Sequence, residues 1–163
     1  MENKISDVTR MVPCSVVFLS VGSKEVKDAM TATATFVAEN LPLLMVSVSK
    51  NSTCHELIEE SGELALNVAT TAQVELARKL GATHGKDVDK FRTFNIESEP
   101  ASKIGAPLIK GSLANIECKV VTSMPASNYI VYLVEAVAYK ADDSKTPIAW
   151  HNNRYFSLGQ EVR

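Results

Sequence analysis

The chain has 163 residues, of which 45% are hydrophobic, and it carries a formal net charge of −2 at pH 7. This size and composition predict one globular domain over residues 1–163, and the scattered Lys and Arg side chains exclude the electrostatic footprint of a nucleic-acid partner. The polar start MENKISDVTR and the short apolar runs predict no membrane segment and a cytoplasmic protein.

Two strand patterns follow a short polar leading segment that ends at Pro13. The run 14–21, CSVVFLSV, is rich in β-branched residues and predicts a buried strand, closed by a turn at 22–24. The run 29–36, AMTATATF, alternates Thr with Ala and predicts a strand with one nearly flat face. A flat face suits a planar ligand, and it equally suits a helix packed closely on the strand.

The stretch 43–69 predicts a strand, a short helix and a second strand in close succession. Residues 43–50 are apolar, β-branched or small, which favours a mostly buried strand. A helix is predicted over 54–61, and Gly62 suits its end. From Leu64, apolar residues alternate with smaller ones as in the next strand.

The start of this helix has the features of a phosphate-binding site. Thr53 and Glu56 form the T-x-x-E pattern of a capping box. Backbone N–H groups and the positive end of the helix dipole face outward there, with Lys50 beside them. However, Ser and Thr at a helix start mostly cap the helix alone, and Glu56 competes for the same field. Both interpretations stay open on these residues.

Two helices are predicted in the middle of the chain, joined by a loop at 84–85. Apolar residues at helical spacing predict the first helix over 73–83. The second, over 86–94, is short and amphipathic, with Val88 and Phe91 facing inward.

After a surface loop at 97–107, the pattern returns to strands. Long strands over 108–124 and 129–141 predict a hairpin, and a last short pair flanks the turn 151–153. Six or more strands with few helices lack the regular strand–helix alternation of a doubly wound sheet. We therefore predict a mainly β fold, an antiparallel β-barrel or strongly curled sheet with short helices at its ends.

Common catalytic signatures are missing from the sequence. It contains no G-x-G-x-x-G, G-x-x-x-x-G-K-[ST], G-x-S-x-G or H-E-x-x-H motif. Cys54 and His55 suggest a nucleophile with its base, but adjacent helix residues point about 100° apart. A reactive Cys54 at a helix start remains an alternative. Because Cys14, Cys54 and Cys118 lie far apart, we expect neither a disulfide framework nor a metal site.

The order of these elements resembles the flavin reductase-like family, whose fold is an FMN-binding split β-barrel and which includes flavoredoxins and ferric reductases. The matching segments run from about residue 10 to 160 and are VPCSVVFLSV, DAMTATATF, LPLLMVSVSKNSTCHELIEESGELALNV, HGKDVDKF, GSLANIECKV and TPIAWHNNRYFSLG. The resemblance implies a split β-barrel with short flanking helices, and a homodimer with FMN near the subunit interface.

The resemblance also implies which residues bind the cofactor. Those expected to line the flavin ring are Met30, Thr31, Ala32, Thr33 and Ala34. Those expected along the ribityl chain and phosphate are Ser47, Ser49, Lys50, Ser52 and Thr53. Lys90 would lie near the flavin, where an ammonium group stabilises the negative charge of the reduced ring. Since flavin N5 carries the chemistry, no catalytic side chain and no metal are expected.

Two positions depart from the family pattern. Asp28 stands where Asn is common, and Asn128 stands where His is common. Asp28 is expected to weaken binding of the electron-rich reduced flavin or to shift its potential. Loss of the His is expected to alter access of the electron donor.

Several functions fit this resemblance, and the first is an NAD(P)H-dependent flavin reductase, in which the nicotinamide stacks on the flavin and gives a hydride to N5. The second is a flavoredoxin-like FMN electron-transfer protein that exchanges electrons with a protein partner. The third is a split-barrel module that no longer holds flavin. Pyridoxamine-phosphate oxidase activity would need cations for a second phosphate, which the few scattered Arg do not favour.

Overall fold

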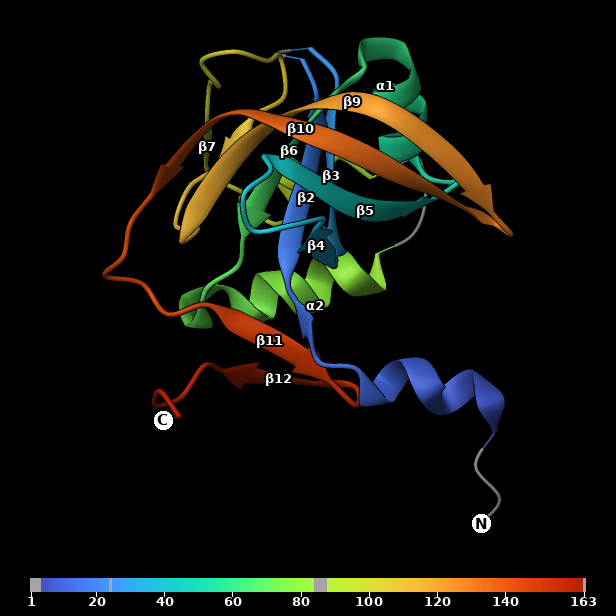
Figure 1. Ribbon diagram of the computed structural model, residues 1–163. Coiled ribbons are helices and arrows are strands. Elements are labelled where there is room, and N and C mark those ends of the chain that lie inside the picture. Colours follow the sequence, from blue (N-terminus) through green and yellow to red (C-terminus); the bar gives the residue numbers. More distant parts are fainter. Residues whose placement is uncertain (1–3, 24, 84–87, 163) are drawn as a thin grey trace.

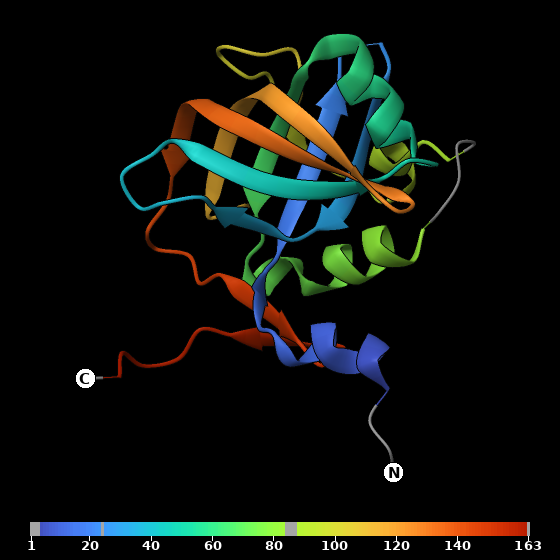
Figure 2. The same cartoon turned by 45° about the vertical axis from the view of Figure 1, so that its right-hand side comes forward.

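The computed structural model describes residues 4–23, 25–83 and 88–162. Its centre is a curled antiparallel sheet of seven strands in the order β3-β2-β6-β9-β10-β5-β4 (Figures 1 and 2). The bounds are β2 (Val17–Gly22), β3 (Lys27–Ala32), β4 (Ala34–Phe36), β5 (Leu43–Ser49), β6 (Glu63–Val68), β9 (Ala114–Ala126) and β10 (Tyr129–Ala141). The predicted mainly β fold with a strongly curled sheet is confirmed.

The two edge strands of this sheet are consecutive in the chain. Ala32 at the end of β3 pairs with Val17 of β2, whereas Ala34 at the start of β4 pairs with Val46 of β5. Thr33 alone therefore carries the chain from one edge of the sheet to the other. The prediction of one strand over 29–36 is wrong, because the sheet curls until its edges meet at this residue.

Helix α1 (Thr53–Ser61) packs its buried face into the curl. Cys54 and Ile58 of the helix join a core cluster with side chains from five strands, among them Leu19, Leu66 and Val134. The helix ends as predicted at Gly62, whose φ of 66° lies in the left-handed region that favours glycine.

Helices α2 (Val74–Ala82) and α3 (Lys90–Thr93) cover the outer face of β3. In both views α2 lies between the large sheet and a small one (Figures 1 and 2). Phe91 is buried as predicted, but Val88 is 38% exposed, because α3 begins only after Asp89 caps it. The loop predicted at 84–85 and the start of the helix predicted from 86 lie outside the described residues.

The remaining elements form small sheets and a leading turn of helix. Strand β1 (Cys14–Ser15) pairs with β11 (Ile148–His151), which pairs with β12 (Arg154–Ser157). Strand β7 (Ser98–Glu99) pairs with β8 (Leu108–Ile109), and η1 (Ile5–Met11) is a 3-10 helix. The loop predicted over 97–107 thus contains a short strand, and the run 14–21 is two strands. Among the described residues, no helix has the length and apolar character to cross a bilayer.

Asn67 of β6 is buried and hydrogen-bonds to residues of β2, β8 and β9. The Asn67 amide donates to Phe18 O and to Ser20 Oγ, both at 2.8 Å. Its side-chain oxygen accepts from Ile109 N at 2.9 Å and from Asn115 Nδ2 at 2.7 Å. Because Asn67 is 0% exposed, these four hydrogen bonds replace all contact with water.

Candidate functional site

A cavity of about 300 Å³ lies where the start of α1, strand β3 and the end of α2 meet. Six of the residues predicted to bind the cofactor line it, namely Met30, Thr31, Ser49, Ser52, Thr53 and Lys90. They come from β3, β5, α1 and α3, and the chain between them spans sixty residues. The fold therefore brings separate predicted segments together around one cavity.

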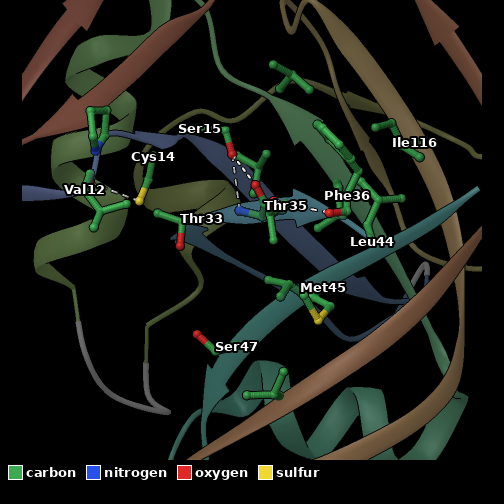
Figure 3. Close-up of a pocket in the computed structure, with 17 residues that line it drawn as sticks. Val12, Cys14, Ser15, Thr33, Thr35, Phe36, Leu44, Met45, Ser47 and Ile116 are labelled. Atoms are coloured by element: carbon green, nitrogen blue, oxygen red, sulfur yellow. Dashed lines mark hydrogen bonds between the residues drawn. The ribbon is translucent and has the colours of Figure 1, made fainter. Parts of the chain in front are cut away.

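Three other predicted residues, Thr33, Ala34 and Ser47, line a second hollow of about 680 Å³. This groove lies beside β1, β4 and β5, and Figure 3 shows it with Phe36 and Met45 among its apolar side chains. The last two predicted residues differ from the rest. Ala32 packs against the core, and Lys50 is exposed in the turn after β5.

The start of α1 is capped by Ser52, one residue earlier than predicted. Its backbone is extended, with φ −98° and ψ 149°, and its hydroxyl oxygen accepts from His55 N at 3.1 Å. The capping box predicted at Thr53 is therefore wrong, because Thr53 is already the first residue of the helix. This cap leaves the N–H groups of Thr53 and Cys54 without an intrahelical acceptor, at the positive end of the helix dipole. Both residues line the cavity, so an anion there meets hydrogen-bond donors.

A buried ion pair lies at the same cavity. Lys90 Nζ is 3.0 Å from Asp28 Oδ1 and donates to Asp28 Oδ2 at 3.1 Å and to Ala29 O at 2.9 Å. Lys90 is 6% exposed and Asp28 is 5% exposed, so both charged residues are buried. The Cys54 thiol donates to Asp28 Oδ2 at 3.3 Å. Ammonium, carboxylate and thiol thus form one hydrogen-bonded cluster.

This cluster contradicts the alternative of a reactive Cys54. Burial, with the neighbouring Asp28 carboxylate as the second cause, raises the pKa of the Cys54 thiol well above its usual value. His55 offers no base for the thiol, because its Nδ1 lies 2.6 Å from the Tyr132 hydroxyl. That hydroxyl in turn donates to Glu59 Oε1 at 2.7 Å. Cys54 and His55 therefore serve different parts of the structure.

Thiol labelling tests this description of the cysteines. Cys54 and Cys118 are buried, and burial raises the pKa of Cys118 to about 12, whereas Cys14 is half-buried. We expect a disulfide reagent to leave Cys54 and Cys118 unmodified in the native protein and to modify all three thiols after denaturation. The Cys14→Ala variant should show no fast reaction. A fast thiol in that variant would contradict the buried cluster.

Some lining residues had no sequence signal for a site. Gly81 lies near the end of α2 and lines the cavity beside Thr31. Tyr129 also lines it, and the neighbouring Asn128 O accepts from Lys50 N at 3.0 Å. Among the described residues, no group of three or more His, Cys, Asp and Glu side chains is placed to hold a metal ion.

Comparison with known proteins places the chain in a family. Residues 9–159 match the model of the flavin reductase like domain, so the chain belongs to that family. It is 27% identical to an NADH-dependent FAD reductase of Streptomyces globisporus over 127 residues, 77% of this chain and 68% of the relative. It is 29% identical to the reductase component of 4-hydroxyphenylacetate 3-monooxygenase of Klebsiella oxytoca over 99 residues. That match covers 61% of this chain and 57% of the relative, less than two thirds of its length.

Solved structures share the fold. An NADH:FAD oxidoreductase of Streptomyces globisporus superposes with a TM-score of 0.85 at 24% identity, over 96% of this chain and 92% of that one. The flavoredoxin of Desulfovibrio vulgaris gives 0.86 at 19% identity, over 100% and 96%. The resemblance to the flavin reductase-like family is confirmed.

Proposed function

We propose that this chain is an NAD(P)H-dependent flavin reductase, that residues 1–163 form one such domain, and that flavin binds in the cavity at the start of α1. Family membership and the names of the relatives support this proposal. The observation that carries it is the cavity itself, where residues from four separate elements surround the N-terminal end of a helix.

The donors at the cavity fit the phosphate of a flavin nucleotide. The N–H groups of Thr53 and Cys54 lie at the helix start, and Ser49 and Thr53, which carry hydroxyl groups, line the same cavity. Met30 of β3 lines the same cavity, and its side chain offers an apolar surface for the ring. A single helix start favours FMN, which has one phosphate, and FAD is the alternative because one relative is named an FAD reductase.

The reaction needs no catalytic side chain in this account. Flavin held by Met30, Thr53 and Cys54 would supply the redox chemistry, which is the acceptance of a hydride from a nicotinamide. The start of α1 would orient the flavin. Cys54 and Leu80 are buried residues that line the cavity and exclude water from that side of it. We also propose that the acceptor is a partner oxygenase, since one relative is named as the reductase component of a monooxygenase.

We further propose that two copies of the chain cover the apolar groove of Figure 3. Inward-facing sheet residues such as Leu66 and Ile116 line the groove, which means that the half-barrel is open there. At its rim, Phe36 is 59% exposed and Met45 is 39% exposed. Exposure of these apolar side chains to water is unfavourable, and a second copy would bury them. Sedimentation equilibrium should give twice the mass of one chain, and the mass of a single chain would contradict this proposal.

Anaerobic reduction distinguishes the reductase from its main alternative. The flavin-loaded protein is mixed with NADH, then separately with NADPH, while the flavin absorption band is followed. Fast bleaching by either nucleotide supports the reductase and identifies the donor. The flavoredoxin-like carrier is the second candidate, favoured by the likeness to a solved flavoredoxin. Slow bleaching by both nucleotides, with fast reduction by a protein donor, would favour the carrier instead.

A further inference from the structure

The Lys90 ammonium is held by acceptor groups of this chain. An ammonium group has three N–H donors. Its Nζ atom lies 3.0 Å and 3.1 Å from the two Asp28 oxygens and 2.9 Å from Ala29 O. Two of these contacts are hydrogen bonds, to Asp28 Oδ2 and to Ala29 O, and the contact with Asp28 Oδ1 is ionic. These contacts bear on the expectation that the ammonium of Lys90 stabilises the negative charge of reduced flavin.

The charge of Lys90 is also compensated. Asp28 is in contact with the ammonium, and both side chains are 7% exposed, so little solvent screens one charge from the other. The third member, Cys54, donates its S–H to the same carboxylate, which requires the neutral thiol. The cluster therefore sums to zero, one cation and one anion with a neutral thiol.

We propose that Asp28 neutralises Lys90 and thereby removes the preference that a bare ammonium would give this site for anionic reduced flavin. The proposal rests on the proposed function, namely that flavin binds in this cavity. Oxidised flavin is neutral at its ring, whereas reduced flavin carries negative charge near N1, so an uncompensated charge nearby would separate their affinities. A cluster with no net charge lets the cavity bind oxidised and reduced flavin with similar strength, so reduced flavin can dissociate. Asp28 is a positioning residue in this account, since it acts through Lys90.

The test compares three variants by the ratio of the dissociation constants of reduced and oxidised FMN, measured anaerobically by equilibrium titration. Asp28→Asn leaves an unpaired cation, so the ratio should fall roughly tenfold or more. Lys90→Gln leaves an unpaired anion, so the ratio should rise. The double variant Asp28→Asn with Lys90→Gln is neutral again, and its ratio should return to that of the natural chain.

This cancellation separates the electrostatic role from a structural one, because general damage would weaken both oxidation states alike. An unchanged ratio in Asp28→Asn, or a double variant that behaves like Lys90→Gln alone, would overturn the proposal. If Asp28→Asn fails to fold around an unpaired buried cation, the comparison of Lys90→Gln with the double variant still tests the proposal, because the ratio should be lower in the double variant. A natural chain that binds FMN in neither state would overturn the proposed function, and the inference with it.

Discussion

Flavin binding should weaken about a hundredfold, or about 2.7 kcal/mol, when Gly81 is replaced by tryptophan. Gly81 lies in α2 and lines the cavity, and a Cβ atom at this position would meet Thr31 Cβ at 3.9 Å, an ordinary contact. A larger side chain must continue from there into the space of about 300 Å³. The indole would fill much of that space, so flavin and side chain could not occupy it together.

The same position offers a matched control. Gly81→Ala should bind flavin as the natural chain does, because its Cβ fits without displacing Thr31. Both variants remove a helical glycine, so Gly81→Ala should gain about 1 kcal/mol and Gly81→Trp about 0.5 kcal/mol in helix propensity, and neither should unfold earlier on heating. Flavin titration by fluorescence quenching and thermal unfolding give the two readouts. Normal flavin binding by Gly81→Trp would contradict the assignment of this cavity.

The free energy of unfolding should fall by about 4 kcal/mol when Asn67 is replaced by leucine. The two side chains have similar size, so the change removes four hydrogen bonds without leaving a large void. Ile109 N, Phe18 O and one Asn115 N–H then remain buried with a partner lost. Each such group costs about 1–3 kcal/mol.

Chemical denaturation measures this loss, and the melting temperature should drop by roughly 10 °C. Asn40→Leu is the control, because Asn40 is exposed in a turn, and its effect should stay within about 0.5 kcal/mol. An Asn67→Leu variant as stable as the control would mean that the network contributes little.

Local patterns predicted individual elements well. The run 43–50, the stop at Gly62 and the long hairpin all depend on neighbours in the chain, and β5, α1 and the β9–β10 pair form where these patterns lie. The strand predicted over 108–124 is wrong at its start, because Leu108–Ile109 form β8, which pairs with β7, and β9 begins only at Ala114. The helix cap was misplaced by one residue, because Ser52 and Thr53 carry the same hydroxyl chemistry and only backbone angles distinguish them.

Long-range pairing could not be predicted from the residues alone. The alternation of Thr and Ala continues through Thr33, whereas the sheet changes edge there, and this depends on the partners β2 and β5. Lys90 was expected near the flavin from the resemblance. Its partner Asp28 lies 62 residues away, so their pairing depends on how α3 folds against β3.

The predicted cofactor residues divide in the same way. Ser49, Ser52 and Thr53 line one cavity because they are close in the sequence, at the end of β5 and the start of α1. The strand predicted over 29–36 is interrupted at Thr33, and Ala34 lines the groove. Residues of that predicted strand therefore line two different hollows. The use of all these residues by flavin stays a prediction.

A crystal structure of the protein with FMN tests the central claim most directly. The account predicts the phosphate at the start of α1, within hydrogen-bond distance of Thr53 N or Cys54 N, and the ring beside Met30. Flavin bound only in the groove beside Phe36 and Met45, with the cavity at α1 filled by water, would contradict it.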